Sequence, residues 1–486
     1  MAIGISGPDR KADKLRVSLS RLKSTVVGHL KSSPLRRRLV SGSSWAFGGK
    51  IGATTITVIT NGLLARMLSP REFGAYLLVL SIISVGAVIG SLGLPKSVVR
   101  FIAENMVLKQ PGRAQRVIYT TLGLGVLGAL GVSLAYLLIL GDLVGKYLFH
   151  SPLLVAVTGL MAGWMAISVM QEIMAESFRG FHDIRMATLF GGVATGGKGS
   201  GLIMKVMLLA FLVLLWSTSG EADLRTVMLM SIGSGSASAL LALMLLHRRV
   251  SSLDTQGAED PVSAKDALRD AFPILLISLT SFVLLSAADL WILGAFRSQE
   301  EVAVYGAAAR LVALIVMPLL ITNLVLPPVI AEMYAEGKTA KLERTLRAYS
   351  TVSGVPSLLI IIAFVLLGGP ILGLVYGSYY ETGTTVLLIL SAGRLVSVWS
   401  GSCGAVLQFT GHQRSMLWVN LLTSPLFLVG ALLVVRQYGP IGVASMTAAV
   451  TILQNVALVL VAKRKTGMWT HVSFSLSPLR KGLSNR

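Results

Sequence analysis

The feature that most constrains this chain is a succession of long apolar stretches that runs from Trp45 to Val461. A helix needs about 20 consecutive apolar residues to cross the hydrocarbon core of a bilayer. Because unpaired backbone groups cannot face lipid, stretches of this length must cross it as helices. Short segments of alternating polarity, which form transmembrane barrels, do not occur in the sequence. We therefore predict an all-α polytopic membrane protein with about twelve transmembrane helices. The predicted spans are 43–65, 73–95, 117–140, 153–178, 186–216, 225–247, 271–296, 302–333, 348–369, 383–410, 415–435 and 441–462.

The meaning of the chain's net charge depends on where its basic residues lie. Only 13% of the 486 residues are charged and 53% are hydrophobic, yet the net charge is +21. In a soluble protein such a charge would indicate nucleic-acid binding. Here the Lys and Arg residues lie at the ends of the apolar stretches, where they set topology and contact anionic lipid headgroups. Nucleic acid is therefore not an expected partner.

The distribution of basic residues predicts which ends of the helices are cytoplasmic. With a cytoplasmic N-terminus, the inner segments hold 32 of the 43 Lys and Arg residues, and the outer loops hold 6. Cytoplasmic loops of membrane proteins carry such an excess. The bias favours twelve spans with both termini in the cytoplasm. The basic tail, residues 1–41, is either an amphipathic helix on the membrane surface or a disordered segment. Its Ser- and Arg-rich composition also resembles an organellar transit peptide, against which Asp9 and Asp13 count.

The chain divides into two halves that resemble each other. The longest linker, 248–267, separates a predicted lobe of six helices at 42–247 from a second at 268–465, and a cytoplasmic tail follows at 466–486. The halves match at an offset near 229 residues, which indicates a parallel duplication. Two such lobes around a central cavity are typical of transporters. The matched pairs are Leu64 and Leu293, Ser69 and Ser298, Glu72 and Glu301, and Tyr76 and Tyr305.

Seven charged residues fall inside predicted spans. Each costs about 2.5–3.5 kcal/mol at the centre of a bilayer. Most must therefore face a hydrated cavity, pair with one another, or lie near an interface. Because basic groups outnumber acidic ones, we predict a cationic cavity. The seven are Lys50, Glu172, Lys198, Lys205, Asp289, Arg310 and Arg394.

Two polar stripes have helical spacing and mark candidate walls of this cavity. Each stripe either lines a lumen or packs against a neighbouring helix, where small and hydroxyl residues favour close contact. The first stripe consists of Lys50, Thr54, Thr57 and Asn61, and the second of Arg394, Ser397, Gly401, Gly404 and Gln408.

Asp289 and Arg310 lie at similar predicted depths in consecutive spans. They form either an ion pair that neutralises both charges or a site at which Asp289 binds a coupling cation and Arg310 tunes it. Glu172 lies beside Glu176 and Arg179 near a cytoplasmic helix end, where an interfacial role is expected. The sequence carries no phosphate-loop motif, and its lone Cys403 cannot form an intrachain disulfide. We predict a transporter without a cofactor, coupled if at all to H⁺ or Na⁺.

Several segments resemble bacterial polysaccharide flippases. The run from Leu64 to Tyr76, Leu-Leu-Ala-Arg-Met-Leu-Ser-Pro-Arg-Glu-Phe-Gly-Ala-Tyr, is similar to the loop between that family's first two helices. Further segments are similar to the second, seventh and eighth helices: Gly93-Leu94, Val99–Ala103, Asp289–Gly294, Val304–Gly306 and Ala309–Leu311. The resemblance spans roughly residues 42–465. It implies membership of the multidrug/oligosaccharidyl-lipid/polysaccharide exporter superfamily.

The resemblance also implies an activity. Such proteins have two six-helix bundles around a V-shaped cavity in the bacterial inner membrane, and each acts as a monomer. They move lipid-linked oligosaccharides to the outer leaflet by alternating access, in company with glycosyltransferases and a polysaccharide polymerase. An undecaprenyl pyrophosphate headgroup would be bound here by Lys50, Asn61, Lys198, Arg310 and Arg394, and a coupling cation by Asp289.

Two alternatives come from different classes of protein. A multidrug antiporter of the same superfamily would need an acidic cavity for cationic drugs. A membrane glycosyltransferase or polymerase would need a large outer loop for its acceptor, whereas the outer loops predicted here are short.

Overall fold

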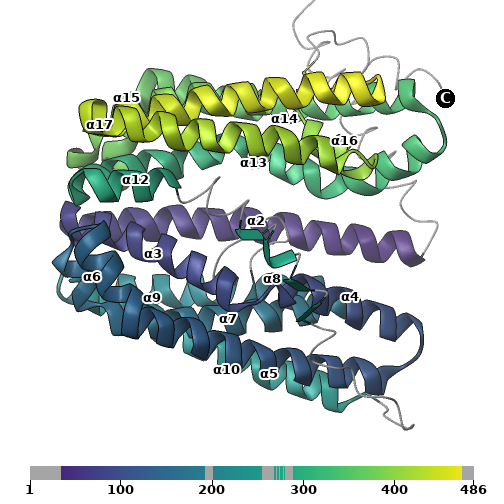
Figure 1. Ribbon diagram of the computed structural model, residues 1–486, viewed down its shortest axis with the longest axis horizontal. Coiled ribbons are helices and arrows are strands. Elements are labelled where there is room, and N and C mark those ends of the chain that lie inside the picture. The colour runs from purple at the N-terminus through teal and green to yellow at the C-terminus, as the bar shows by residue number, and fades with distance from the viewer. Residues whose placement is uncertain are drawn as a thin grey trace, which may run out of the picture.

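The computed structural model is a bundle of long helices lying side by side in two layers (Figure 1). It describes residues 34–191, 201–253, 268–269, 271–272, 274–276, 278–279 and 288–472. Within these ranges the chain is helical and contains no strand. The all-α architecture predicted from the sequence is confirmed. Helices from residues 34–251 form the lower layer of Figure 1, and those from residues 288–466 form the upper layer.

The first half of the chain, up to residue 251, supplies the lower layer. Its helices are α2 (Pro34–Met67), α3 (Pro70–Gly90), α4 (Leu94–Val107), α5 (Pro111–Ala135), η1 (Tyr136–Leu140), η2 (Leu143–Leu148), α6 (Pro152–Ala156), α7 (Thr158–Gly180), α8 (Ile184–Phe190), α9 (Leu202–Thr218) and α10 (Leu224–Ser251).

The second half supplies the upper layer. Its helices are α12 (Ala288–Phe296), α13 (Gln299–Ala335), α14 (Thr339–Tyr376), η4 (Ser378–Gly383), α15 (Thr384–Ser400), α16 (Cys403–Phe409) and α17 (Gln413–Thr466).

The lengths of these helices fit the predicted spans. In the described part of the chain, seven helices are long and apolar enough to cross a membrane. One of them, α17, bends at Gly439, where φ is 52°, and its 54 residues cover the last two predicted spans. The remaining predicted spans fall on α2, α7, α9 and α12, so helical residues match all twelve. The outward faces are apolar: Leu138, Leu366 and Leu433 are 75%, 73% and 75% exposed, as lipid-facing side chains would be.

Two spans predicted as continuous helices are interrupted, and that part of the prediction is wrong. The span at 186–216 is split because α8 ends at Phe190 and Gly191 is extended (φ −127°, ψ 172°) before α9 begins. The span at 383–410 is split at Gly401, where φ is 68°. A side chain at Gly401 would meet the Ser350 hydroxyl at 2.1 Å, so only glycine fits this left-handed turn.

A further helix, α4, was not separated from its neighbours by the hydropathy pattern. Leu92 and Gly93 both have positive φ, 53° and 76°, and they end α3 and turn the chain before α4 begins. With α5, α4 forms a hairpin at the right-hand end of Figure 1.

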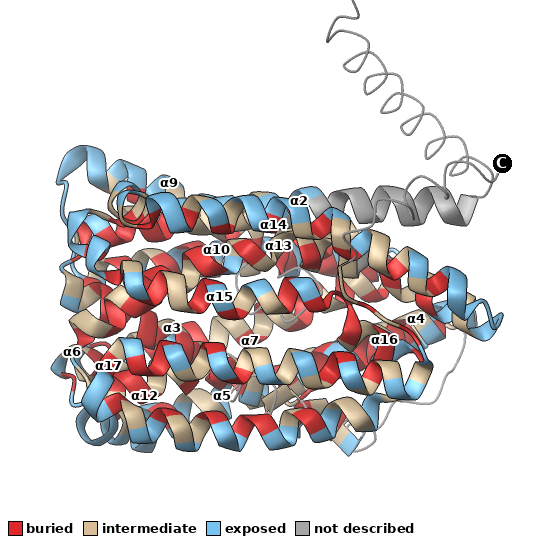
Figure 2. Cartoon of the chain, turned by 90° about the horizontal axis from the view of Figure 1, so that it is seen from above, coloured by how far each residue is buried: buried red, intermediate tan, exposed pale blue. Residues whose placement is uncertain are grey.

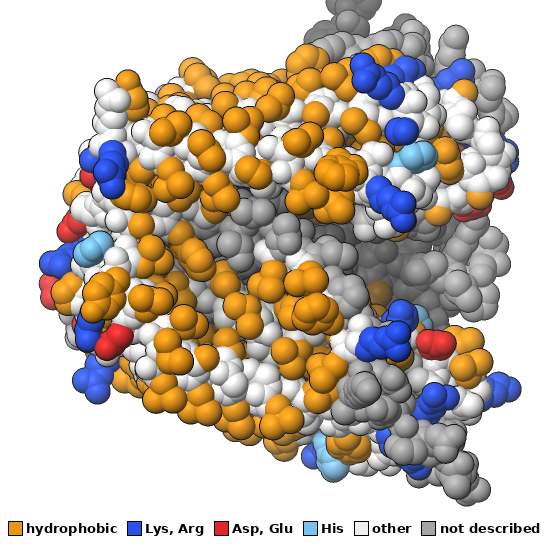
Figure 3. Space-filling view, viewed as in Figure 1, with side chains coloured by type: hydrophobic (Ala, Val, Ile, Leu, Met, Phe, Trp, Pro, Cys, Tyr) orange, Lys and Arg blue, Asp and Glu red, His pale blue; other side chains and the backbone are white. Residues whose placement is uncertain are grey.

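The two ends of the bundle differ in charge. We call the right-hand end of Figure 1 the basic end, and the left-hand end, where α6 lies, the opposite end. Figure 3 shows apolar side chains across the middle of the visible face and charged side chains at both ends. Figure 2 shows that buried residues lie where helices face one another. The basic end carries Lys109, Arg113, Arg248, Arg249, Lys338, Lys341, Lys463, Arg464 and Lys465.

At the opposite end the matched halves begin corresponding helices in the same way. Ser69 caps α3 by accepting a hydrogen bond from the Glu72 backbone N–H at 3.3 Å. Ser298 caps α13 by accepting one from the Glu301 backbone N–H, also at 3.3 Å. Connections here are short: two residues separate α2 from α3 and two separate α12 from α13.

The layers meet where α3 crosses α13. A Cβ added at Gly74 would lie 1.8 Å from the Gln299 carbonyl oxygen and 3.3 Å from the Ala303 nitrogen, and one added at Gly306 would lie 2.3 Å from the Leu77 side chain. At the offset of 229 residues, Gly74 corresponds to Ala303 and Leu77 to Gly306. Residues that contact their own counterparts lie on a pseudo-two-fold axis between the halves.

Candidate functional site

A polar cluster lies where α12, α13, α15 and α17 converge inside the second half. The Tyr305 hydroxyl donates to Asp289 Oδ2 at 3.0 Å and lies 3.3 Å from the Thr447 hydroxyl. Asp289 Oδ1 accepts from the Leu290 backbone N–H at 2.8 Å. Arg394, on α15, is near enough to interact electrostatically with both Asp289 and Tyr305. The carboxylate therefore has a phenol as hydrogen-bond donor and a guanidinium as nearby counter-charge.

The basic partner of Asp289 is Arg394, whereas the sequence suggested Arg310. Equal depth in adjacent spans was the ground for expecting an Asp289–Arg310 pair. Depth does not fix the direction in which a helical side chain points. Tyr305 and Arg310 are five residues apart, so they project about 140° apart around α13. Because Tyr305 faces Asp289, Arg310 faces elsewhere.

Arg310 lies between the two halves. Its charge acts on Tyr76 of α3 and on Tyr376 at the end of α14. The side chain is half-buried, and no carboxylate of the described chain forms an ion pair with it. A guanidinium cannot lose its charge at physiological pH, so this position holds a permanent cation.

The opposite end is closed by an aromatic cluster formed by Phe73, Tyr76, Tyr376 and Tyr380. The Phe73 ring contributes from the first half, with its centroid 5.7 Å from the Tyr380 ring and 6.3 Å from the Tyr376 ring. The hydroxyls of Tyr376 and Tyr380 are buried and have no hydrogen-bond partner. Arg66 of α2 also crosses the boundary, where Nη2 donates to the Leu374 carbonyl at 2.6 Å.

In the first half, the polar stripe of α2 meets α9. Lys205 Nζ donates to Thr57 Oγ1 at 2.9 Å, and the Asn61 amide donates to the Thr57 carbonyl at 2.6 Å. Asn61, a predicted binding residue, is 4% exposed. Thr54 contacts Met317 of α13 across the boundary, with the hydroxyl oxygen 3.8 Å from the sulfur. Two other predicted binding groups, the Lys50 side chain and Lys198, lie outside the described part of the chain.

The residues of the second predicted stripe make different kinds of contact. Ser397 accepts a hydrogen bond from Asn455 Nδ2 at 3.0 Å, and Gly401 allows the close approach of Ser350. Both positions therefore pack helices together. Arg394, one turn before Ser397, is the member of the stripe that faces the Asp289 cluster.

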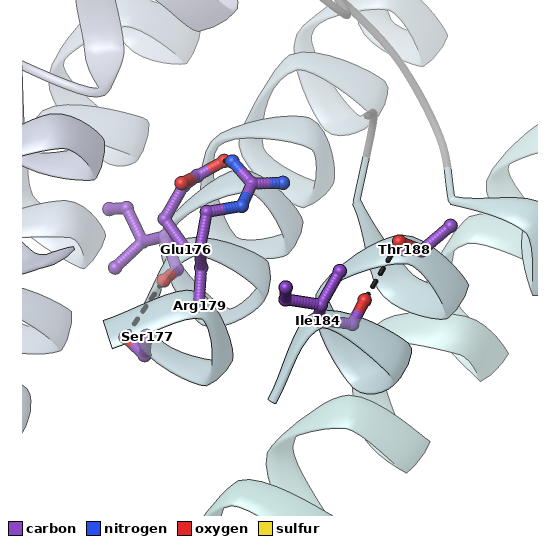
Figure 4. Close-up of polar contacts among 6 residues, drawn as sticks. Glu176, Ser177, Arg179, Ile184 and Thr188 are labelled. Atoms are coloured by element: carbon purple, nitrogen blue, oxygen red, sulfur yellow. Dashed lines mark hydrogen bonds and ion pairs between the residues drawn. The ribbon is translucent and has the colours of Figure 1, made fainter. Parts of the chain in front are cut away.

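One of the two acidic residues at the basic end of α7, Glu176, has a local partner. Figure 4 shows Arg179 folded back onto Glu176 one turn earlier, and the two form an ion pair. Nearby hydroxyls bond to their own helices: Ser177 donates to the Ile173 carbonyl at 2.8 Å and Thr188 to the Ile184 carbonyl at 2.8 Å. The pair links consecutive turns at the end of α7. The described residues contain no group of three His, Cys, Asp or Glu that could hold a metal ion.

Sequence reasoning missed two members of the Asp289 cluster. Tyr305 stood out as a residue of the repeat and of the flippase-like segment Val304–Gly306, and its polar role would have followed from asking what its hydroxyl bonds inside a membrane. Thr447 carries no signal beyond being a hydroxyl in an apolar stretch.

Two family models match the chain. The model described as polysaccharide biosynthesis protein matches residues 39–334, and the MatE model matches residues 273–433. The first of these covers more than half of the chain. No curated protein matches the sequence.

Solved structures of several transporters have the same fold. An inward-facing multidrug-resistance MATE transporter of the MOP superfamily has a TM-score of 0.69 at 16% identity, covering 85% of this chain and 94% of that one. A MOP superfamily transporter from Pyrococcus furiosus has a TM-score of 0.63 at 16% identity, with coverages of 90% and 97%. The lipid II flippase MurJ in an inward closed conformation has a TM-score of 0.63 at 11% identity, with coverages of 91% and 89%. Family and fold are those of membrane transporters and flippases and not those of enzymes.

Proposed function

The chain belongs to the polysaccharide biosynthesis protein family, and from this premise we propose that it is a flippase for a lipid-linked oligosaccharide. The family expected from residues 64–76 and 289–311 is thereby confirmed. The proposed substrate is an oligosaccharide on undecaprenyl pyrophosphate. It moves from the cytoplasmic to the outer leaflet of the bacterial inner membrane and serves surface polysaccharide synthesis. We expect the protein to act as a monomer beside the glycosyltransferases and polymerase of that synthesis.

The observation that carries this proposal is the position of Arg310. A permanent cation lies half-buried near Tyr76 and Tyr376 of the aromatic cluster, with no carboxylate paired to it in the described chain. Isolated buried charges are strongly unfavourable unless they are paired. A pyrophosphate supplies the missing charge, and a guanidinium binds phosphate oxygens in bidentate geometry. Arg394 and Asn61 would complete the binding surface, together with Lys50 and Lys198.

The proposed path follows from which end is closed. The α3–α13 contact and the aromatic cluster close the opposite end. By the positive-inside rule we expect the basic end to face the cytoplasm, and we expect both termini to be cytoplasmic. The substrate would therefore enter between the two lobes, 42–247 and 268–465, from the cytoplasm. Parting of α3 from α13 would release it to the outer leaflet.

Deletion of the gene in its native host tests the substrate directly. We expect a completed oligosaccharide-lipid to accumulate on the cytoplasmic side, with loss of surface polysaccharide, because the carrier is stranded in the inner leaflet. Leaflet-resolved analysis of extracted lipid-linked oligosaccharides measures this, and a plasmid copy of the gene is the control. Normal polysaccharide without an accumulated intermediate, once a redundant flippase is removed, contradicts the proposal.

A second candidate function, export of small molecules, is favoured by the MatE match over residues 273–433. The same deletion separates the two. Drug sensitivity with intact surface polysaccharide would identify an exporter. Against it stands the excess of basic over acidic groups in the spans, since cationic drugs call for an acidic cavity.

We propose that Asp289 binds the coupling cation, H⁺ or Na⁺. Asp289→Asn keeps an oxygen that accepts the Tyr305 hydroxyl and removes the charge. We expect transport into proteoliposomes to fall about tenfold or more and to lose its response to pH or Na⁺. Asp142→Asn, in an exposed pair with Lys146 at the opposite end, is the matched control. If Asp289→Asn keeps the wild-type rate and ion response, Asp289 serves only to pair with Arg394.

A further inference from the structure

The aromatic cluster at the opposite end contains two hydroxyl groups that its packing does not need. The rings of Tyr376 and Tyr380 pack against each other with their centroids 5.8 Å apart, and both pack against Phe73 across the boundary. Tyr376 is 0% exposed and Tyr380 is 2% exposed. No described residue hydrogen-bonds to either hydroxyl. Phenylalanine at both positions would supply the same rings without burying an unpaired polar group.

Two unpaired hydroxyls in one cluster call for an explanation, because the hydroxyl of a buried tyrosine normally has a partner. Closure of the opposite end does not explain them, since an unpaired buried hydroxyl destabilises the closed state in which it occurs. The repeat does not require them either. At the offset of 229 residues Tyr376 corresponds to Tyr147, which is 73% exposed. A ligand that meets the two hydroxyls when the halves part at this end would account for both.

Arg310 lies next to this cluster. Its charge acts on Tyr76 and Tyr376, so the guanidinium is close to both side chains. The end of α14 also contacts α2, because a Cβ added at Gly62 would lie 2.6 Å from the Val375 carbonyl oxygen. The unpaired Tyr376 hydroxyl therefore belongs to a region where α2, α13 and α14 meet near a permanent cation.

Asn61 of α2 faces the same region. The Thr54 hydroxyl contacts the Met317 sulfur of α13 at 3.8 Å, which aligns the two helices. Asn61 lies two turns beyond Thr54 toward the opposite end, and Arg310 lies two turns beyond Met317 in the same direction. Two turns return a side chain to nearly the same face, so Asn61 and Arg310 face each other at about the same depth. Asn61 Oδ1 is also buried without a hydrogen-bond partner among the described residues.

These groups together suit a sugar that is attached to a phosphate. The hydroxyls at the edge of a sugar ring can donate to and accept from tyrosine hydroxyls and an amide. The C–H groups on its faces are attracted by the electron-rich face of an aromatic ring. In a lipid-linked oligosaccharide the first sugar is bonded directly to the pyrophosphate. A pyrophosphate held by Arg310 would therefore place that sugar beside the aromatic cluster.

We propose that Tyr376 and Tyr380 are further substrate-binding residues, whose hydroxyls bind the first sugar next to a pyrophosphate held by Arg310 when the halves part at the opposite end. Asn61 contacts the same sugar–pyrophosphate unit from α2. This rests on the proposed flippase function and assigns it a sugar-binding site. In the closed protein the two tyrosine rings close the outlet, and the sugar supplies the partners of their hydroxyls once the outlet opens.

Binding of two lipids to the purified full-length protein in nanodiscs, followed by native mass spectrometry, tests the proposal. One lipid is the oligosaccharide-lipid that accumulates in the deletion strain, and the other is undecaprenyl pyrophosphate without a sugar. Because the two lipids share anchor and headgroup, the ratio of their affinities measures what the saccharide contributes. Tyr376→Phe and Tyr380→Phe, singly and together, remove only the hydroxyls. Tyr147→Phe, at the exposed counterpart of Tyr376, is the matched control.

We expect wild type to bind the oligosaccharide-lipid more tightly than the bare lipid. The double variant should reduce this ratio about tenfold, because a hydrogen bond between neutral groups contributes a factor of about three. Its affinity for the bare lipid should stay near wild type, as should both affinities of Tyr147→Phe. Without lipid, the double variant should unfold at the wild-type temperature or above it, since it buries two fewer unpaired hydroxyls.

Each contrary outcome has a distinct meaning. An unchanged ratio in the double variant, or a wild-type ratio near one, would mean that the hydroxyls do not bind the sugar, and the inference fails while the flippase proposal stands. A lower unfolding temperature of the double variant would show that the hydroxyls have partners in the closed protein, which removes the ground for the inference. If no oligosaccharide-lipid accumulates in the deletion strain, or if wild type binds neither lipid, both proposals are overturned.

Discussion

Gly74→Leu is expected to abolish transport and leave the protein folded and inserted in the membrane. A Cβ at this position would lie 1.8 Å from the Gln299 carbonyl oxygen, which belongs to the backbone and cannot move aside alone. The two halves could then no longer meet at the opposite end. Overpacking costs about 1–3 kcal/mol or more, and a penalty of about 3 kcal/mol lowers the closed population more than 100-fold relative to the open one. A transporter that cannot close one end cannot complete its cycle.

Accessibility of the interface gives the measurement. Ala303→Cys, in a Cys403→Ser background, places a thiol at a position that is 0% exposed. It should resist a membrane-impermeant maleimide in the parent and react when Gly74 is leucine. Gly131→Leu is the matched control, because nothing lies within 4 Å of a Cβ there. Normal transport by Gly74→Leu would show that α3 and α13 do not have to meet.

Arg310→Ala is expected to lower transport by roughly 10- to 100-fold while leaving stability and abundance nearly unchanged. Hydrogen bonds to a charged group contribute about 1.5–3 kcal/mol, and Arg310 makes no ion pair in the described chain that its loss would break. Arg394→Ala is expected to lower transport as strongly and also to reduce stability. The difference arises because Asp289 would lose the guanidinium near it.

Transport of lipid-linked oligosaccharide in reconstituted vesicles, with thermal unfolding in parallel, tests this contrast. The double variant Arg394→Ala/Asp289→Asn should recover stability but not transport, since it removes the unpaired charge without restoring the phosphate ligand. Arg347→Ala, in a pair with Glu343 at the basic end, is the control. Full transport by both single variants would exclude the two arginines as headgroup ligands.

Most of the architecture was predictable because hydrophobic length and basic loops are properties of the sequence itself. The repeat was visible for the same reason: Ser69 and Ser298 are helix caps, and capping chemistry depends on residues three positions apart. The break at Gly439 was predictable, because it falls between the predicted spans 415–435 and 441–462. The break at Gly401 was not, because glycine is common in membrane helices and only the contacts around this one require a positive φ.

The sequence predicts which charged residues lie in the membrane, but not which residues they contact. Hydropathy places Asp289, Arg310 and Arg394 in the membrane, but the rotation of each helix decides what its side chains face. That rotation gave Arg394 rather than Arg310 as the nearby counter-charge of Asp289. Helix rotation also brings Lys205 to Thr57, which is 148 residues away in the chain. No local sequence pattern predicts this contact.

The short connections at the opposite end have a consequence for the cargo. Two residues join α2 to α3, two join α12 to α13, and the two helical parts of α17 meet at the non-helical Gly439. When the halves part at this end, the rim of the opening consists of helix ends and of the η4 turn that carries Tyr380. Such an opening would not limit the length of the saccharide that follows the headgroup. Selection would then act on the anchor and the first sugars, and one protein would accept saccharides of different lengths.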